Sequence, residues 1–330
     1  MKKLNIALLS GGRSSERGVS IKSGDQVYNA LDKSRYNVFR YDPAYDIERL
    51  IADAKNIDFA LIILHGVYGE DGSIQGLLDM LGIPYQGSGV LGSALAMNKW
   101  VSRRLYMDAG LSVPPFEVLR KGQRIETANI VDRLGLPLVV KPVNSGSSIG
   151  ITIVQEKSYI KKALDHAFCY DHVIMIEKFI KGTEITGGVI GNDHLQALPI
   201  VEIVPDKQYA FFDYEAKYKE GATREICPAR LDKNISSRAQ ECAIIAHKTL
   251  CCRGYSRTDM IVDHNGTIFV LETNTIPGMT PASLFPLAAK AAGISFSQLL
   301  DRLIELGMEA KQVCKLQARR QVQYRDDHRE

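Results

Sequence analysis

Two carboxylates near the end of the chain, Asp259 and Glu272, have the spacing of a facing pair on a β-hairpin. An Asn-Gly pair at 265–266 separates two runs of β-favouring residues, and Asn-Gly is the strongest short signal for a two-residue hairpin turn. With that turn, Asp259 lies opposite Glu272, and Arg257 lies opposite Asn274. The other face of the hairpin is predicted to be core, with Met260 paired with Leu271 and Val262 paired with Phe269.

Facing carboxylates in a sheet repel each other, because their Cβ atoms lie only about 5 Å apart. A divalent cation between Asp259 and Glu272 would offset this repulsion, with the side-chain carbonyl of Asn274 as a third oxygen ligand. Mg²⁺ commonly binds one or two protein carboxylates and completes its shell with waters and phosphates. The alternative is a solvent-exposed polar face on which Arg257 neutralises Asp259. The hairpin alone does not decide between the two.

The composition is that of a soluble globular protein with two or three packed units. Of its 330 residues, 45% are hydrophobic and 24% are charged. The net charge of +3 is too small to indicate a nucleic-acid surface, and no apolar run reaches the ~20 residues of a membrane span. The six cysteines form no C-x-x-C pair, and the N-terminal apolar run lacks a signal-peptide cleavage site. We therefore expect a cytoplasmic protein that binds neither nucleic acid nor membrane.

Two polar loops follow predicted strands in the first part of the chain. A buried strand over residues 4–10 ends in a Gly-Gly turn, and a helix is predicted to start near Glu16. A second strand over residues 59–64 leads into a polar loop over residues 65–72. Because ligands of open α/β sheets gather beyond the carboxyl ends of the strands, residues 1–95 are predicted to form a βαβ unit with a polar rim. The first turn lacks a full G-x-G-x-x-G, which argues against NAD.

A lysine precedes a loop of small residues in the middle of the chain. The predicted strand over residues 136–142 carries Lys141, and residues 144–150 read N-S-G-S-S-I-G. The backbone N–H groups of such a loop can surround phosphate oxygens, although the sequence is not a Walker A loop. An ordinary hairpin turn is the alternative, and Lys141 at the start of the loop favours phosphate.

The rest of the pattern predicts further strands, a helix, a lid and a tail. Strands are expected over residues 173–177 and 198–204, and a helix is expected over residues 236–254. Residues 211–228 begin with aromatic residues and continue as a polar, irregular segment, which is typical of a lid. Apolar periodicity fades beyond Val313, so the chain after it is expected to be disordered.

Six separated motifs give the chain a family resemblance. They read S-G-G-R-S-S-E-R, L-H-G-V-Y-G-E-D-G, G-S-G-V-L-G-S-A-L-A-M-N-K, V-V-K-P-V-N-S-G-S-S-I-G, Y-E-A-K-Y and R-T-D-…-L-E-T-N-T-I-P-G-M-T. Together they resemble the D-alanine–D-alanine ligases of the ATP-grasp superfamily, over nearly the whole chain up to about Val313. The resemblance implies an α/β fold, α+β in its C-terminal parts, with an ATP-grasp architecture behind a Rossmann-like βαβ domain. It implies a substrate-binding domain over 1–95, a central ATP-grasp domain over 96–182, a C-terminal catalytic domain over 183–313 and a disordered tail over 314–330.

The activity implied by the resemblance is the ligation of two D-alanines, with release of ADP and phosphate, for peptidoglycan precursor synthesis. ATP would phosphorylate the first D-alanine to D-alanyl phosphate, and the amine of the second would displace the phosphate. The predicted lid would exclude water from this intermediate. Two Mg²⁺ ions, for which Mn²⁺ can substitute, would be held by Asp259, Glu272 and Asn274. A homodimer is the family's expected state.

Roles for single residues follow from the same resemblance. Phosphates would be bound by three lysines: Lys99, Lys141 and Lys217. The nucleoside would be bound by one short segment and a nearby carboxylate: Glu177, Lys178, Phe179, Ile180 and Glu184. The catalytic set would comprise Glu16 for the ammonium of the first D-alanine, Ser147 and Tyr218 bonded to Glu16, and Arg257 and the Gly278 backbone for the oxyanion. His65 would line the subsite of the first D-alanine, and Ser283 and Leu284 would border that of the second. By itself, His65 indicates only an orienting hydrogen-bond partner.

Three alternatives remain open from the sequence. An ATP-grasp ligase for other substrates would keep the metal and lysine sets but lack the combination of Glu16, Ser147 and Tyr218. A relative that uses D-serine or D-lactate as second substrate is another, and the D-lactate enzymes carry a histidine-containing loop near Tyr218 that this chain lacks. A catalytically silent nucleotide-binding module is disfavoured by the intact metal set and by Arg257.

Two residues depart from the family pattern. Gly18 stands where an acidic residue is expected after the Glu-Arg pair, and Ile276 replaces a small polar residue before Pro-Gly. Neither change removes a catalytic atom, and both are expected to lie at the rim of the pocket.

Overall fold

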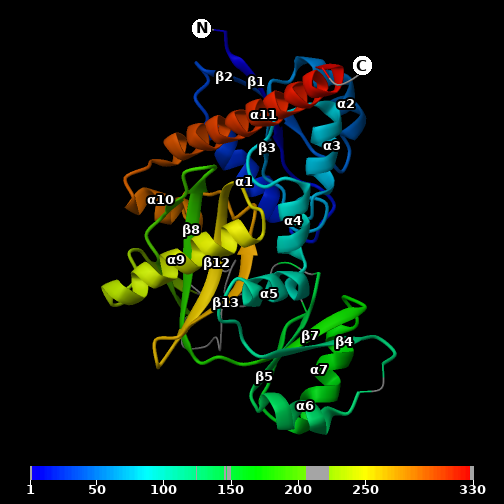
Figure 1. Ribbon diagram of the computed structural model, residues 1–330, viewed down its shortest axis with the longest axis vertical. Coiled ribbons are helices and arrows are strands. Elements are labelled where there is room, and N and C mark those ends of the chain that lie inside the picture. The colour runs from blue at the N-terminus through cyan, green and yellow to red at the C-terminus, as the bar shows by residue number, and fades with distance from the viewer. Residues whose placement is uncertain (1, 124, 145, 147–149, 206–222, 328–330) are drawn as a thin grey trace.

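The first sheet of the computed structural model is the predicted parallel βαβ unit (Figure 1). The structure describes residues 2–123, 125–144, 146, 150–205 and 223–327, with side chains up to Lys311 except that of Pro205. Three strands pair in the order β2-β1-β3, all parallel: β1 (Leu4–Leu9), β2 (Tyr36–Tyr41) and β3 (Phe59–Ile62). Helices α1 (Arg17–Ala30) and α2 (Ile47–Asp53) lie between these strands in the chain, and α3 (Ser73–Leu81) follows them.

The apolar run of β1 is buried on both faces, as predicted. Ile6 and Leu8 belong to a core cluster that includes residues of α1, whereas Ala7 and Leu9 belong to a second cluster with residues of α3. All four side chains are 0% exposed. Because neighbouring side chains of a strand point to opposite faces, this central strand is fixed from both sides, and so is the polar loop at its carboxyl end.

The second sheet is antiparallel and carries three of the residues predicted to bind the nucleotide: Lys141, Glu177 and Lys178. Its order is β4-β7-β5-β6, with β4 (Phe116–Arg120), β5 (Leu138–Pro142), β6 (Thr152–Val154) and β7 (Val173–Lys178). Helices α6 (Thr127–Leu134) and α7 (Ile160–Ala167) bury their apolar residues in the core of this unit. Lys141 lies near the end of β5, and Glu177 lies near the end of the neighbouring β7.

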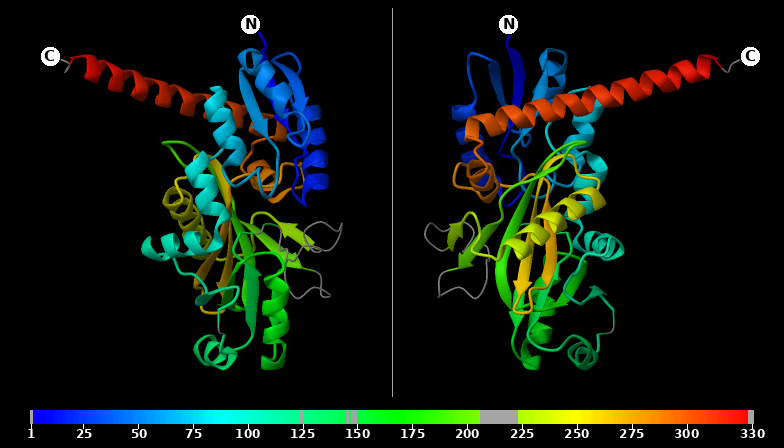
Figure 2. Two further views of the ribbon diagram at one scale, coloured as in Figure 1. Left: turned by 90° about the vertical axis from the view of Figure 1, so that its right-hand side faces the viewer. Right: turned by 60° about the vertical axis from the view of Figure 1, so that its left-hand side comes forward.

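The third sheet contains the hairpin with the paired carboxylates. Its main order is β11-β10-β8-β12-β13, and β9 pairs with β8. The strands are β8 (Gly182–Gly191), β9 (Gln196–Ala197), β10 (Val201–Pro205), β11 (Thr223–Ile226), β12 (Gly254–Asp263) and β13 (Ile268–Asn274). Helix α9 (Lys233–Thr249) packs on β8, β12 and β13 (Figures 1 and 2). Helices α4 (Val90–Met97) and α5 (Lys99–Asp108) lead from the first sheet towards the other two.

The hairpin of β12 and β13 has the predicted carboxylate pairing. Asp259 pairs with Glu272, and Arg257 pairs with Asn274. Between Asp259 and Met260 the register shifts by one residue, so the pairing predicted for the rest of the hairpin is wrong. The pairs that precede this β-bulge, including Arg257 with Asn274 and Asp259 with Glu272, are therefore confirmed, and the pairs that follow it are not.

The turn is a three-residue loop instead of the predicted two-residue turn. The N–H of Asp263 donates to the carbonyl of Thr267 at 3.0 Å, which closes the loop. The Asp263 carboxylate accepts the N–H groups of Asn265 at 2.9 Å and Thr267 at 2.8 Å. These side-chain bonds stabilise the wider loop, in which Gly266 takes the positive φ of +76°.

The wider loop changes which residues of β13 are buried. Met260 and Val262 are 1% and 5% exposed, as predicted for core residues. One additional residue in the loop moves every side chain of the partner strand to the opposite face, until the bulge restores the register. The buried apolar residues of β13 are consequently Ile268 and Val270, in place of the predicted Phe269 and Leu271.

The C-terminal helices pack back against the first sheet. Helix α10 (Leu284–Ala291) is followed by α11 (Phe296–Asp327), whose leucines join the core cluster of β1 and β3. At Gly307 an added Cβ would lie 2.5 Å from the carbonyl oxygen of Tyr85, so the helix approaches the sheet closely there. The predicted domain boundaries stay predictions. Helix α11 begins in the predicted C-terminal domain and contacts β3 of the predicted N-terminal domain.

The predicted disordered tail is wrong over residues 314–327, where the backbone is helical. Figure 2 shows this end of α11 extending beyond the body of the protein. The chain contains no Gly or Pro after Gly307 and is rich in Gln, Arg and Lys, which are good helix formers. Lack of apolar periodicity therefore did not prevent helix formation. No helix in the described part of the chain has the length and apolarity of a membrane span.

Deletion of residues 314–330 is expected to lower the melting temperature by no more than about 2 °C. The reason is that α11 reaches the core well before this segment. Among the side chains of α11 that the structure describes, five are 2% exposed or less: Leu299, Leu300, Leu303, Ile304 and Leu306. Thermal unfolding of the full and shortened chains, followed by circular dichroism, measures the difference. A loss of ten degrees or more would show that the deleted segment stabilises the fold.

Candidate active site

A cleft of about 620 Å³ lies between the first sheet and the hairpin of the third sheet. Its walls come from the loops after β1 and β3, from the junction of α4 and α5, and from β13 and the loop that follows it. Nine of the residues predicted for the site line this cleft: Glu16, His65, Lys99, Arg257, Glu272, Asn274, Gly278, Ser283 and Leu284.

The carboxylate of Glu16 is enclosed by two glycines. Glu16 directly precedes α1 and is 5% exposed. A Cβ at Gly66 would lie 2.7 Å from Glu16 Oε2, and a Cβ at Gly146 would lie 3.1 Å from it, so a side chain at Gly66 would clash with this carboxylate. The Ser14 hydroxyl donates to the carbonyl of His65 at 2.6 Å and ties the loop after β1 to the loop after β3.

Glu70 is a second carboxyl group in the same cleft. It is half-buried, and its Oε2 accepts the N–H of Gly66 at 2.6 Å. Burial, and then the negative charge of Glu16, raise the pKa of Glu70 to about 8. The neutral form of Glu70 is thereby favoured at neutral pH, so this residue adds little negative charge to the cleft.

His65 is a neutral hydrogen-bonding group between the loops and the hairpin. Burial lowers its pKa, Arg257 acts in the same direction, and Glu16 opposes both. The imidazole donates to the backbone carbonyl of Ile276. Since that acceptor belongs to the main chain, the unusual side chain of Ile276 leaves this hydrogen bond in place, and the side chain itself is buried at 3% exposure.

Arg257 and Asp259 form a two-point ion pair on the hairpin. The Nε and Nη2 atoms of Arg257 each donate to one oxygen of Asp259 at 2.8 Å. Asp259 also accepts the hydroxyl of Thr186 at 2.8 Å and the amide of Asn274 at 3.3 Å. The side chains of the pair are only 12% and 15% exposed, so this is not the solvent-exposed polar face considered as the alternative.

Lys99 is positioned by the start of α5. The side chain of Asn98 accepts the N–H of Val101 at 3.0 Å and caps the helix, while the N–H of Lys99 donates to the carbonyl of Val143 at 3.1 Å. The Lys99 ammonium lies 3.5 Å from the Glu272 carboxylate. Each of the two facing carboxylates of the hairpin is thus accompanied by one cation.

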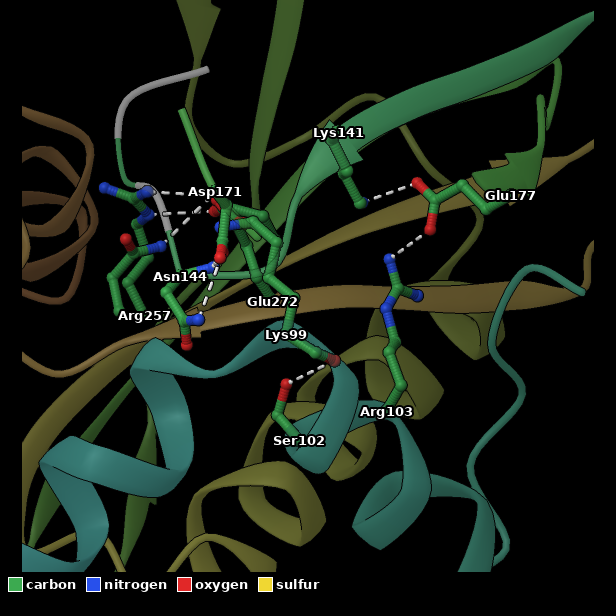
Figure 3. Close-up of polar contacts among 11 residues, drawn as sticks. Lys99, Ser102, Arg103, Lys141, Asn144, Asp171, Glu177, Arg257 and Glu272 are labelled. Atoms are coloured by element: carbon green, nitrogen blue, oxygen red, sulfur yellow. Dashed lines mark hydrogen bonds and ion pairs between the residues drawn. The ribbon is translucent and has the colours of Figure 1, made fainter. Parts of the chain in front are cut away.

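The second sheet and α5 together contribute a buried group of three charges (Figure 3). The Lys141 ammonium lies 2.6 Å from Glu177 Oε1, and Nη2 of Arg103 lies 3.0 Å from Glu177 Oε2. Burial lowers the pKa of Lys141 to about 8, partly opposed by the charge of Glu177. The segment after β7 connects the second sheet to the third, so the predicted nucleoside residues run from the end of β7 through this connection to β8. Glu184 follows on β8.

The oxygen donors of the hairpin fit a divalent cation in their chemistry. Among the described residues, no three His, Cys, Asp or Glu side chains are grouped closely enough to hold a metal by themselves. Asp259 and Glu272 would therefore need Asn274 and the oxygens of a bound phosphate to complete a coordination shell. Such a shared site is typical of Mg²⁺ in enzymes that act on nucleotides.

Three of the predicted site residues lie outside the part of the chain that the structure describes, and the structure adds others. Ser147, Lys217 and Tyr218 lie outside the described residues, together with most of the predicted lid. Sequence reasoning assigned no role to Glu70 or Arg103. Glu70 lies within a quoted motif, so its motif was a usable signal, whereas Arg103 shares a helical face with Lys99 and gave no signal of its own.

Two family models match this chain. The family model described as the D-ala D-ala ligase N-terminus matches residues 42–88, and the D-ala D-ala ligase C-terminus matches residues 105–305. The second match alone covers more than half of the chain. This chain belongs to the D-alanine–D-alanine ligase family.

Individual members of the family are similar over nearly their whole length. The D-alanine–D-alanine ligase of Syntrophobacter fumaroxidans is 63% identical over 308 residues, which are 93% of this chain and 99% of that protein. The crystal structure of the Bacillus anthracis D-alanine–D-alanine ligase complexed with ATP has a TM-score of 0.83 at 38% identity and covers 94% of this chain and 99% of its own. A D-Ala:D-Ser ligase from Enterococcus faecalis has a TM-score of 0.80 at 32% identity and covers 93% and 100%. The predicted α/β, ATP-grasp fold class is thereby confirmed.

Proposed function

We propose that this protein is an ATP-dependent ligase that joins two D-alanines to D-alanyl-D-alanine through a D-alanyl phosphate. The observation that carries the proposal is a single cleft. It is lined both by residues proposed to bind an amino acid and by residues proposed to bind phosphate. Glu16 and His65 come from the first sheet, whereas Lys99, Arg257 and Glu272 come from α5 and the hairpin. A carboxylate can be phosphorylated only where both sides meet.

The first D-alanine is proposed to bind beside Glu16. The buried Glu16 carboxylate would pair with the substrate ammonium, and the protonated Glu70 would avoid a second negative charge there. The substrate carboxylate would then face the hairpin and its cations. The second D-alanine is proposed to lie near Ser283 and Leu284, from where its amine attacks the acyl phosphate.

ATP is proposed to lie between the second and third sheets. The segment from Glu177 to Ile180 and Glu184 would bind adenine and ribose, while Lys99 and Lys141 would contact phosphates. The family uses ATP with a divalent metal, and we propose two Mg²⁺ ions held by Asp259, Glu272 and Asn274. When bound, such ions offset the charge of the transferred phosphoryl group.

Arg257 is proposed to stabilise the oxyanion that forms when the amine attacks the acyl phosphate. Its guanidinium lines the cleft and is held in place by Asp259, so no rearrangement is needed to orient it. The Gly278 backbone lies beside Ser283 on the same wall, where an added Cβ would lie 3.1 Å from the Ser283 hydroxyl oxygen. We further propose that the protein acts in the cytoplasm as a homodimer, as the family resemblance implies.

ADP release with and without D-alanine tests the proposal. Release should require D-alanine, and mass spectrometry should detect the dipeptide. Parallel assays that add D-serine or D-lactate test the two related activities, and we expect neither to compete with D-alanine as second substrate. ADP release that is independent of D-alanine, or dependent on an unrelated carboxylate, would contradict the proposed substrate.

The kcat/KM for ATP is expected to fall as the pH rises through about 8, the pKa to which burial lowers Lys141. Above this pH the free enzyme loses the ammonium that is proposed to contact phosphate. The assay uses saturating D-alanine, so that weaker binding of D-alanine on deprotonation of Glu70 does not affect the result. In Lys141→Arg the decline should move to higher pH, because a guanidinium keeps its proton. An unchanged profile in that variant would argue against a phosphate contact by Lys141.

A further inference from the structure

A buried arginine on α5 shares the carboxylate of Glu177 with Lys141, so that Glu177 has two cationic partners. Arg103 is 0% exposed, and its Nη2 lies 3.0 Å from one oxygen of Glu177. The other oxygen of Glu177 accepts the Lys141 ammonium at 2.6 Å. Figure 3 shows Glu177 between the two cations. A further N–H of Arg103 donates to the carbonyl of Val270 on β13, so the guanidinium is held from two sides.

The arrangement contains one more cation than the carboxylate requires. Burial acts to raise the pKa of Glu177, but the charges of Lys141 and then Arg103 outweigh it and lower that pKa. If the Lys141 ammonium turned towards a phosphate, Glu177 would lose one of its two partners. A buried carboxylate left with no partner is strongly disfavoured. With Arg103 in place, Glu177 keeps a charge-assisted hydrogen bond.

We propose that Arg103 is a positioning residue that holds the Glu177 carboxylate and thereby releases the Lys141 ammonium to bind a phosphate of ATP. This inference rests on the proposed ATP-dependent reaction. Arg103 itself would not touch the nucleotide. It acts through Glu177, which stays charged and oriented whether or not the nucleotide has drawn Lys141 away.

An arginine suits this position better than a lysine. The planar guanidinium can direct separate N–H groups at Glu177 and at the Val270 carbonyl, and it stays protonated when buried. Lysine carries a single nitrogen on a flexible stem and loses its proton more readily on burial. Lys141 illustrates this, since burial lowers its pKa to about 8.

The first test compares ADP with adenosine as ligands of the full-length protein, by titration calorimetry. In Arg103→Met, Lys141 should stay paired with Glu177, so ADP should bind roughly tenfold to a hundredfold more weakly. Adenosine lacks phosphates, and its affinity should change by less than about threefold, because Glu177 stays in place. Arg104 is the exposed neighbour on the same helix, and Arg104→Met is the matched control that should alter neither affinity. An equal loss for both ligands would overturn the proposal in favour of general damage to the site.

A second test uses Glu177→Gln as the background. With a neutral residue at this position, Lys141 is no longer held, so adding Arg103→Met should weaken ADP by less than about threefold. If Arg103→Met weakened ADP binding only because a positive charge near the phosphates was lost, the same weakening would also appear in this background. A further loss of tenfold or more would therefore overturn the proposal. This comparison also serves if Arg103→Met alone does not fold, because removing both members of a buried ion pair is better tolerated than removing one.

ADP binding by the wild-type protein separates a failure of the proposed function from a failure of the role proposed for Arg103. Failure of the wild type to bind ADP at all would contradict the proposed function. Normal binding by the wild type, with Arg103→Met unchanged for both ligands, would contradict only the role of Arg103.

Discussion

Replacement of Glu272 by Gln is expected to lower kcat by about a hundredfold or more and to leave the fold intact. Glu272 faces Asp259 across the hairpin and lies 3.5 Å from the Lys99 ammonium. The amide keeps the shape of the side chain but removes one of the two negative charges that would hold a divalent cation against ATP. The loss should appear mainly in kcat, because charge on the phosphoryl group develops in the transition state.

Stability separates this effect from misfolding. Glu272→Gln removes a like charge opposite Asp259 together with a partly buried ion pair to Lys99. These two effects oppose each other, so the melting temperature should change little. Glu241→Gln, an exposed change on α9, is the control and should keep full activity. Near-normal kcat in Glu272→Gln across a Mg²⁺ titration would contradict the assignment of Glu272 as a metal ligand.

Replacement of Glu16 by Gln is expected to lower kcat/KM for the first D-alanine by roughly a hundredfold to a few thousandfold. The substrate ammonium would lose its charged partner in a buried site, which costs about 3–5 kcal/mol, or a factor of ten for each 1.4 kcal/mol. The ATP KM should stay nearly constant, since Glu16 belongs to the loop after β1 and the nucleotide is proposed to lie between the other two sheets.

The control for this change is Glu48→Gln, an exposed carboxylate in the first turn of α2. Steady-state kinetics with D-alanine and ATP varied separately distinguish the two substrates. If Glu16→Gln raised the KM for ATP and for D-alanine to the same extent, its role as the ammonium partner would be refuted.

Sequence reasoning succeeded where the signal was local. The Asn-Gly turn and the alternation of residues place Asp259 opposite Glu272, although the turn proves one residue wider because Asp263 binds the loop N–H groups. The bulge after Asp259 compensates for that residue. A period-two pattern therefore located the chemically important pair but not the buried residues of β13.

The contacts that sequence reasoning missed depend on packing between distant segments. Arg103 binds Glu177, which lies in a different sheet, and no spacing along the chain predicts that a charged residue of a helix is fully buried. The raised pKa of Glu70 likewise arises from burial and from Glu16 in another loop. The helix over residues 314–327 was missed because its residues favour a helix without the apolar periodicity used to detect one.

The formation of D-alanyl phosphate is tested most directly with D-alanine labelled with oxygen-18 in its carboxylate. In the proposed reaction a carboxylate oxygen attacks the γ-phosphorus of ATP, and the amine of the second D-alanine later breaks the bond between that oxygen and the carbonyl carbon. One labelled oxygen should therefore leave with the phosphate, while ADP carries none, and mass spectrometry of the released phosphate measures this. We predict one oxygen-18 atom in each phosphate released during dipeptide synthesis, whereas phosphate free of the label would contradict an acyl phosphate intermediate.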